Sequence, residues 1–326
     1  MALSKGSKGD DVRRLQNGLT FLGYPAGAAD GDYGRSTENA VAAFQKKQKL
    51  FVDGKAGDVT LSAYNAALAP LGASGEPYTV KVNPVISLAP VAAPTGTLLK
   101  WVKSKADKVP GRDGYANMVL REDIAADYQK LLDAVHSCGG VLTSSGGRRD
   151  LESESGPNRS MKSLHYLGRA FDMSLDTGMV DPATDSFVIE RPNPNSRLWK
   201  VWGRSSFTPS GPGLVQQVTV DGWYMNIGKD AKGKTLKQPA TKTVTFNGFD
   251  FTDLAFGFGF TPIQARPGFF QGDLLGAEWW HFQNMKGLTS GITFGSELLR
   301  VYSPEDAAKF VYWNDVKDAR FGSDWG

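Results

Sequence analysis

The chain has 326 residues, of which 40% are hydrophobic and 22% charged, the balance of an ordinary globular protein with a normal core. At roughly 100–200 residues per domain, this length predicts two or three domains. The formal net charge is only +3 and no long run of like charges occurs, so nucleic-acid binding is not expected.

The single cysteine, Cys138, excludes an intrachain disulfide and a cysteine-based zinc site. It follows an apolar helical stretch, so we expect a buried, unreactive thiol. No stretch approaches the roughly 18 apolar residues that a membrane span requires, and the N-terminal residues lack the apolar core of a signal peptide. We therefore expect a protein made in the cytoplasm, and we expect it to be a monomer.

Residues 1–68 show helical periodicity and an internal repeat. Two helical faces are apolar: Val12, Leu15 and Leu19, then Ala40, Val41 and Phe44. The pattern Asp-Gly-x-x-Gly-x-x-Thr occupies residues 30–37 and returns at residues 53–60. Each copy is a glycine turn followed by a threonine that suits the start of a helix. The segment therefore predicts a three-helix bundle.

Further segments of this bundle have a recognisable spacing. They read Gly9-Asp10-x-Val12-x-x-Leu15-Gln16, Leu22-Gly23-Tyr24 and Ala40-Val41-x-x-Phe44-Gln45. Together with the glycine turns they resemble the peptidoglycan-binding domain found at the ends of many cell-wall hydrolases. The resemblance implies that bacterial peptidoglycan is the partner, bound in a groove near the glycine turns. Such a domain indicates where the protein works and leaves its reaction open.

Residues 69–97 are rich in alanine, proline and glycine, which predicts a semi-extended linker. Residues 98–326 then form a second domain. A helix is expected over residues 119–138, with one apolar side made of Ile124, Tyr128, Leu131, Leu132 and Val135. Gly139-Gly140 should end it, and Val141-Leu142-Thr143 should form a short strand.

Candidate metal ligands are few, because the chain has three histidines. His136 lies in the expected helix and is interpreted as structural, whereas apolar and aromatic residues flank His165 and His281. Asp172 lies between Phe171 and Met173, and a carboxylate in apolar surroundings needs a cation or strong donors. A catalytic zinc needs about three protein ligands. The seven-residue spacing of His165 and Asp172 is also compatible with a surface loop and a histidine buried in the core. The spacing alone therefore does not identify a metal site.

The fuller pattern is Ser163-x-His165-x-x-Gly168-x-Ala170-x-Asp172, followed by Glu278-x-x-His281. This resembles the metallopeptidase family of D-alanyl-D-alanine carboxypeptidases, D-Ala-D-Ala dipeptidases and phage L-alanyl-D-glutamate endopeptidases. An upstream Ser-Gly-x-Arg at residues 145–148 stands in the expected order. The resemblance covers residues 115–145 weakly and residues 298–326 hardly at all.

The resemblance implies a role for each matching residue. His165, Asp172 and His281 would bind one zinc ion, which lowers the pKa of a bound water from about 15.7 towards 7. Glu278 would be the general base that takes a proton from this water and the acid that returns it to the leaving amine.

Three further residues would assist. Arg148 would stabilise the developing oxyanion, and the adjacent Arg149 is an alternative for that role. Ser163 would position the substrate or the first histidine. The implied fold is α+β: a small antiparallel sheet carries the metal and helices pack on one side of it.

The stretch between the two motifs departs from compact members of this family. Residues 176–270 read as a β-rich insertion, with a strand pattern at 241–246 and several aromatic residues, among them Trp199, Trp202 and Trp223. These aromatics either form the core of the insertion or wall the cleft and contact glycan. Gly257-Phe258-Gly259-Phe260 reads as a flexible loop.

The combined reading is a zinc-dependent peptidoglycan peptidase, most simply a D-Ala-type carboxypeptidase or endopeptidase that acts as an endolysin-like or delivered lytic enzyme. An L-alanyl-D-glutamate endopeptidase is the first alternative. A catalytically silent wall-binding protein is the alternative from another class. Without a recognisable secretion signal, access to the wall would follow holin-type release or injection.

Overall fold

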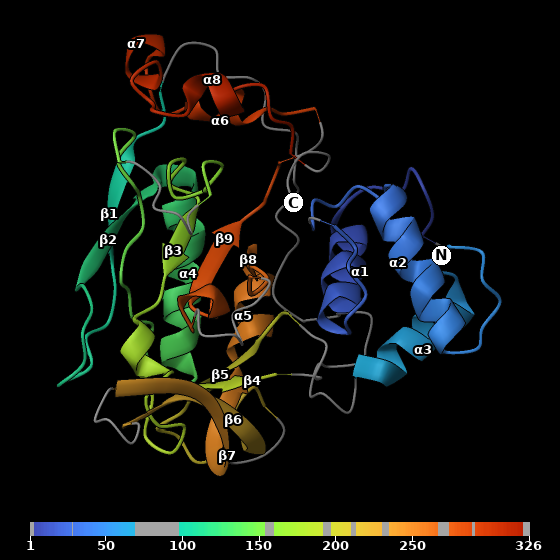
Figure 1. The fold of residues 1–326 in the computed structure, drawn as a ribbon, viewed down its shortest axis with the longest axis vertical. Coiled ribbons are helices and arrows are strands. Elements are labelled where there is room, and N and C mark those ends of the chain that lie inside the picture. The colour runs from blue at the N-terminus through green and yellow to red at the C-terminus, as the bar shows by residue number, and fades with distance from the viewer. Residues whose placement is uncertain are drawn as a thin grey trace.

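The structure is a computed structural model that describes residues 3–27, 29–68, 98–153, 160–191, 197–209, 213–229, 235–266, 274–288 and 291–321. Within them the fold is mixed α+β, with N-terminal helices followed by several small antiparallel sheets, one of them a closed barrel (Figure 1). The expected linker over 69–97 lies outside the described residues. The division at residues 68 and 98 stays a prediction.

Three helices make up the N-terminal region: α1 (Asp10–Phe21), α2 (Arg35–Lys47) and α3 (Asp58–Leu68). The apolar faces expected from the sequence are buried in one core, which contains Val12, Leu15, Leu19, Ala40, Val41 and Phe44. The expected bundle is therefore present.

A buried glutamine explains why the first glycine turn has its pattern. Gln16 is 1% exposed, and its Nε2 donates to Asp30 Oδ1 at 2.9 Å and to Thr37 Oγ1 at 3.0 Å. Its Oε1 accepts a hydrogen bond from the Gly31 backbone N–H at 2.9 Å. Aspartate, glycine and threonine of the motif thus meet on one side chain.

Gln45 makes the equivalent hydrogen bonds to the aspartate, glycine and threonine of the second turn. Its Nε2 donates to Asp53 Oδ1 at 2.8 Å and to Thr60 Oγ1 at 3.0 Å, and its Oε1 accepts from the Gly54 N–H at 2.9 Å. The repeat in the sequence is therefore a repeated hydrogen-bonded unit.

Gln45→Leu should destabilise this region by about 2–3 kcal/mol, because the buried Gly54 N–H and Thr60 hydroxyl lose their partner. Native-state hydrogen exchange over residues 29–68 measures the loss. Gln48→Leu is the matched control, since Gln48 is exposed in the C-cap of the same helix. Equal effects of the two substitutions would contradict the role of Gln45.

The second region begins with the antiparallel pair β1 (Trp101–Lys105) and β2 (Asn117–Arg121), followed by α4 (Glu122–Ser137). The helix expected over 119–138 therefore starts later, because residues 119–121 belong to β2. All five residues of its expected apolar side are buried, as is Cys138. Gly139, with φ 68°, follows the C-cap of the helix as expected.

The strand expected at Val141–Thr143 was wrong. Thr143 makes a single isolated bridge to Asp107, and the Leu142 N–H donates to the Asp107 carboxylate at 2.7 Å. A side chain takes the donor that a strand ladder would have used, so pairing does not propagate.

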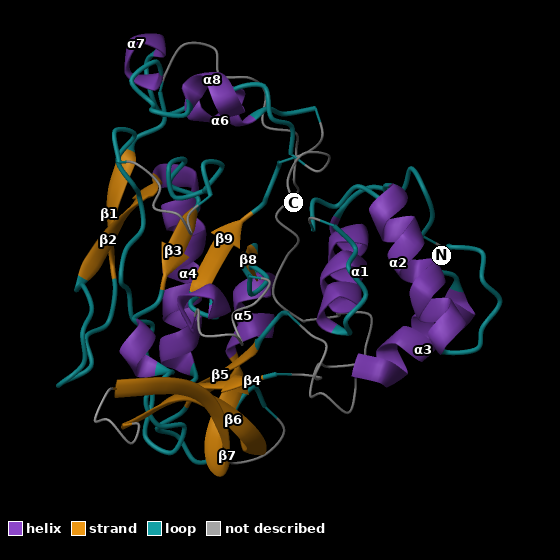
Figure 2. Cartoon of the chain, in the orientation of Figure 1, coloured by secondary structure: helices purple, strands orange, loops and turns teal. Residues whose placement is uncertain are grey.

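The small sheet expected to carry the metal has the order β3-β9-β8 and is antiparallel throughout. Its strands are β3 (Ala170–Asp172), β8 (Phe260–Pro262) and β9 (His281–Asn284). Helices α4 and α5 (Phe251–Gly257) cover it (Figure 2). Tyr128 of α4, for example, lies 5.2 Å from Phe171 between ring centroids. Because α5 ends at Gly257 and β8 starts at Phe260, the flexible loop expected over 257–260 was wrong for those two residues.

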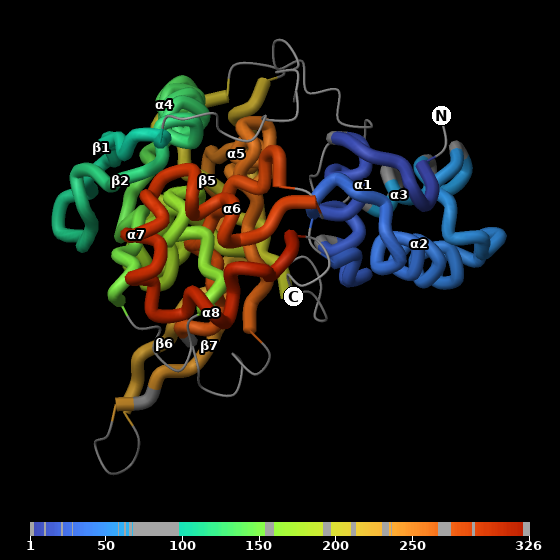
Figure 3. The backbone as a smooth tube through the Cα atoms, turned by 90° about the horizontal axis from the view of Figure 1, so that it is seen from above, coloured from blue at the N-terminus to red at the C-terminus, as the bar shows by residue number. Residues whose placement is uncertain are grey.

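In the sequence, the segment between β3 and β8 forms a closed four-stranded barrel of order β4-β5-β7-β6. It consists of β4 (Phe187–Glu190), β5 (Lys200–Arg204), β6 (Gln216–Lys229) and β7 (Thr235–Asp250). The strand expected at 241–246 lies within β7, and Figure 3 shows the β6–β7 hairpin projecting. Trp199, Trp202 and Trp223 are at most 3% exposed, so they are core residues, not a glycan-facing wall.

The C-terminal segment contains α6 (Phe294–Leu298), α7 (Pro304–Ala307) and α8 (Trp313–Val316). It forms a second core with residues next to His165, namely Leu164, Tyr166 and Leu167. None of the helices in the described ranges has the length and hydrophobicity needed to cross a bilayer.

Candidate metal centre

The loop that carries His165 is fixed by its buried neighbours and by a hydrogen bond to the ring of His165. Its neighbours Leu164 and Tyr166 are buried, and His165 itself is 3% exposed. His165 Nδ1 is hydrogen-bonded to the Gly147 carbonyl oxygen, which can only accept, so Nδ1 carries the proton. The other ring nitrogen, Nε2, is therefore unprotonated in the neutral ring and free to bind a cation.

Strand pairing brings the other two candidate ligands to the same point. The register of β3 against β9 places Asp172 opposite His281, and Asp172 Oδ1 lies 3.0 Å from His281 Nδ1. Asp172 Oδ2 lies 3.2 Å from His165 Nε2, and the two histidine nitrogens are also 3.2 Å apart. One ligand atom from each residue thus lies within 4.8 Å of the others.

This donor set fits a zinc ion. Zn–N bonds of about 2.0–2.1 Å in a tetrahedral site put ligand atoms about 3.3 Å apart, close to the separations found here. Two imidazoles and a carboxylate are also a usual set for a catalytic zinc. Burial raises the pKa of Asp172, but His165 and His281 outweigh it and hold that pKa well below its ordinary value. The carboxylate therefore stays ionised, as a ligand must.

Glu278 lies beside this group in an unusual backbone conformation. Its φ is +55°, a left-handed value that non-glycine residues rarely adopt. The His281 N–H donates to the Glu278 carbonyl at 3.1 Å, which closes the turn into β9. Trp199 Nε1 donates to the Ala277 carbonyl at 2.6 Å, so a residue of the main hydrophobic core supports this turn.

Glu278 is 7% exposed, and burial raises its pKa despite the opposing charges of His281 and Arg266. Arg266 forms an ion pair with the carboxylate. Sequence reasoning missed Arg266, because it belongs to neither motif and follows a stretch without regular pattern. Its contact depends on the fold, since Arg266 N–H also donates to the Gly276 carbonyl at 2.7 Å.

The two arginines expected near the oxyanion make other contacts. The Arg148 guanidinium lies 4.6 Å from the ring centroid of Trp101 and donates to the Tyr302 hydroxyl at 3.1 Å and to Asp150. Arg149 lies over the Tyr166 ring at 5.3 Å. Within the described residues neither arginine forms an ion pair with the three ligands or Glu278, although the Arg149 backbone N–H donates to the His165 carbonyl at 3.1 Å. The oxyanion role of Arg148, or of Arg149, stays a prediction.

Ser163 lies at the start of the His165 loop. Its hydroxyl accepts a hydrogen bond from the His165 N–H at 3.4 Å. That contact corresponds to the second of the two roles expected for it, placing the first histidine, and its part in substrate binding stays a prediction.

Comparison with known proteins bears first on the N-terminal region. Residues 8–63 match the family model described as a putative peptidoglycan binding domain. The N-terminal domain is a peptidoglycan-binding domain. The match agrees with the domain type expected from the glycine turns and helical spacings. Peptidoglycan as the bound partner stays a prediction. The match ends at residue 63 and does not include the region that contains His165, Asp172 and His281.

Several known proteins share part of the chain. A probable N-acetylmuramoyl-L-alanine amidase of Bacillus licheniformis is 35% identical over 126 residues, which is 36% of this chain and 36% of that protein. The chain thus spans about a third of this curated relative. The N-terminal domain of SleB is 37% identical and covers 21% of this chain and 92% of its own, with a TM-score of 0.20.

A fused Zn-dependent amidase/peptidase/peptidoglycan-binding domain-containing protein of Clostridium acetobutylicum is 17% identical. The match covers 79% of this chain and 87% of that one, with a TM-score of 0.19. Neither TM-score is high enough to indicate a shared fold.

Proposed function

We propose that this protein is a zinc-dependent peptidoglycan hydrolase that cuts an amide bond in the peptide part of the wall. One observation carries the proposal: His165, Asp172 and His281 converge beside a buried Glu278, in a chain that also has a peptidoglycan-binding domain. Zinc ligands next to a buried carboxylate are the arrangement used for metal-assisted amide hydrolysis.

The roles follow from the chemistry of each group. His165 Nε2, Asp172 and His281 Nδ1 would hold the ion, which when bound supplies Lewis acidity and an activated water. Glu278 takes the proton of the attacking water and delivers it to the departing amine nitrogen as the C–N bond breaks. Arg266 orients the Glu278 carboxylate before substrate arrives and opposes the rise that burial causes in its pKa. The buried surroundings strengthen these interactions by excluding water.

Within this class we favour a D-Ala-type carboxypeptidase or endopeptidase, because the motif Glu278-x-x-His281 resembles that branch of the peptidase family. An L-alanyl-D-glutamate endopeptidase is the nearest alternative. A further candidate is an N-acetylmuramoyl-L-alanine amidase, since that is the activity in the name of the relative from Bacillus licheniformis. A silent wall-binding protein is the candidate from another class.

Digestion of purified peptidoglycan separates all four. The zinc-loaded full chain is incubated with walls, and mass spectrometry identifies the new ends. Free D-alanine or cleaved cross-links support the D-Ala reading, new D-glutamate amino ends support the endopeptidase, and free L-alanine amino ends with intact glycan support the amidase. If the loaded protein releases no amine from walls, the enzyme reading fails and the binding protein remains.

Removal of residues 1–68 should weaken hydrolysis of whole walls and spare that of a short soluble stem peptide. The bound domain raises the local substrate concentration, and such tethering is worth about 10²–10⁴-fold when the geometry allows it. Initial rates on the two substrates measure the effect. A double substitution of Gln16 and Gln45 by leucine in the full chain is the companion variant, because it disrupts the same domain without shortening the chain. Equal losses on both substrates would contradict a targeting role.

A further inference from the structure

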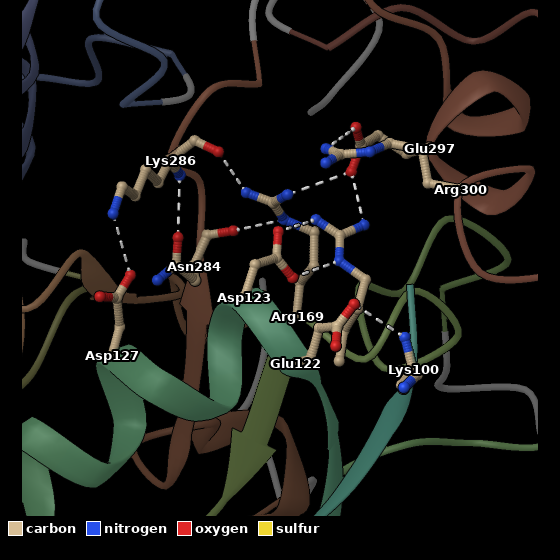
Figure 4. Close-up of polar contacts among 10 residues, drawn as sticks. Lys100, Glu122, Asp123, Asp127, Arg169, Asn284, Lys286, Glu297 and Arg300 are labelled. Carbon is tan, nitrogen blue, oxygen red and sulfur yellow. Dashed lines mark hydrogen bonds and ion pairs between the residues drawn. The ribbon is translucent and has the colours of Figure 1, made fainter. Parts of the chain in front are cut away.

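A largely buried cluster of charged side chains joins residues at the start of α4 and β3 to α6 of the C-terminal segment (Figure 4). We call it the arginine cluster, and its members are Arg121, Asp123, Arg169, Glu297 and Arg300. Neither motif of the metal centre accounts for it. Buried charges of this kind are retained only where they are paired, and their loss leaves an uncompensated charge.

Arg169 connects the cluster directly to the strands that carry two ligands. It lies between His165 and Asp172 in the sequence and is 2% exposed. Its Nε donates to the Asn284 carbonyl at 2.9 Å, and its Nη2 donates to the Lys286 carbonyl. The Asn284 N–H in turn donates to the Arg169 carbonyl at 2.7 Å. Arg169 therefore fastens the start of β3 to the end of β9, at the opposite end of this three-pair ladder from Asp172 and His281.

Glu297 is the acceptor on which the arginines meet. It lies in α6 and is 2% exposed. Its Oε2 accepts from Arg121 Nη1 at 2.7 Å and from Arg169 Nη1 at 3.1 Å, while its Oε1 accepts from Arg300 Nη1 at 3.0 Å. Burial raises the pKa of Glu297, but these arginines outweigh it and lower that pKa to about 2.

Arg121 carries the connection to the His165 loop. Its backbone N–H donates to the Gly168 carbonyl at 3.1 Å, and the Gly168 N–H donates to the His165 carbonyl at 3.1 Å. The Arg121 side chain is held by Asp123 at 2.7 and 2.9 Å as well as by Glu297. Two successive hydrogen bonds thus connect the Arg121 backbone to His165 through Gly168.

Apolar packing joins the same two parts of the chain. Leu164, Tyr166 and Leu167 are at most 1% exposed and share a core with residues of the C-terminal segment. The Tyr166 and Phe310 rings, for example, lie 4.7 Å apart between centroids. The C-terminal segment therefore contacts the His165 loop through both charge and packing.

We propose that Glu297 is a positioning residue for the metal centre: from the C-terminal segment it fixes Arg169 and Arg121, and through them the spacing of His165 to Asp172 and His281. The proposal rests on the proposed function, because it presupposes that these three residues bind a metal. It gives residues 291–321, which neither motif reaches, a part in building the site.

Glu297→Gln tests this in the full chain. Glutamine has nearly the same shape but turns an amide N–H₂ towards arginines that only donate, so at least one arginine loses its acceptor. The zinc dissociation constant should rise by on the order of tenfold, the lower end of the range for residues that orient ligands. In the cobalt-substituted protein, the d–d absorption bands should shift, because they report ligand geometry.

Val244→Ala is the control for a general loss of stability, since Val244 is buried in the barrel core. It should lower the melting temperature and leave zinc affinity and the cobalt spectrum unchanged. Arg300→Gln, at the more exposed edge of the cluster, should shift both metal readouts in the same direction by less, and it decides the matter if Glu297→Gln does not fold.

The outcomes are distinct. If the unmodified chain binds zinc but the Glu297 variant (or, where that variant does not fold, the Arg300 variant) has the same affinity and cobalt spectrum, the cluster is merely structural and the inference is overturned. If the unmodified chain binds neither metal, the proposed function fails and this inference fails with it. A spectral shift in Val244→Ala as large as that in Glu297→Gln would also overturn it.

Discussion

Replacing Glu278 with glutamine should abolish hydrolysis of peptidoglycan and leave zinc binding intact. The amide cannot accept the proton of the attacking water, and general base catalysis alone contributes about 10²–10⁴-fold. The three ligands do not include Glu278, so the metal should remain. Isothermal titration with zinc and release of amines from purified walls measure the two effects separately.

Glu305→Gln is the matched control, because Glu305 is an exposed glutamate in α7. It should retain full activity. If Glu278→Gln keeps more than a tenth of the unmodified rate, Glu278 is not the base, and the ion pair with Arg266 would then be a purely structural contact.

Replacing Asp172 with asparagine should remove the metal itself. A neutral amide is a poor zinc ligand, and only two imidazoles would remain at a site that needs about three protein ligands. We expect zinc affinity to fall by more than about 100-fold, with hydrolysis lost in parallel. Competition with a chromogenic chelator measures the affinity.

A thermal measurement checks the same prediction independently of activity. Zinc that binds only the folded chain stabilises it by about 2.7 kcal/mol at a hundredfold excess over its dissociation constant. The melting temperature of the unmodified protein should therefore rise with zinc, and that of Asp172→Asn should not. Asp315→Asn, at an exposed position, should behave like the unmodified chain. A zinc-dependent rise that persists in Asp172→Asn would remove this residue from the ligand set.

The sequence indicated the three candidate ligands because they belong to a spaced motif with a known chemistry. That they converge could not be derived from spacing, since Asp172 and His281 meet through the β3–β9 register across a long intervening stretch. The apolar faces of the N-terminal helices were predictable for a different reason. Periodicity is a local property, and Val12, Leu15 and Leu19 occupy the buried face that it predicts.

The contacts of Arg148 could not be predicted from the motif. Its partners Trp101 and Tyr302 come from β1 and from the segment after α6, and neither has a place in the motif. Arg266 was missed for the complementary reason, because only the folded chain brings it to Glu278. Val141–Thr143 has a β-type composition, but Asp107 takes the Leu142 N–H and a ladder does not form.

The position of the barrel in the chain has a practical consequence. His165 and Asp172 precede it, whereas Glu278 and His281 follow it, and the long β6–β7 ladder holds its two sides together. A cut between these strands would yield two polypeptides, each carrying half of the centre. Complementation would then depend on the ladder re-forming from separate pieces, which makes this hairpin a natural place to split the protein into a reporter whose activity returns only when the pieces reassemble.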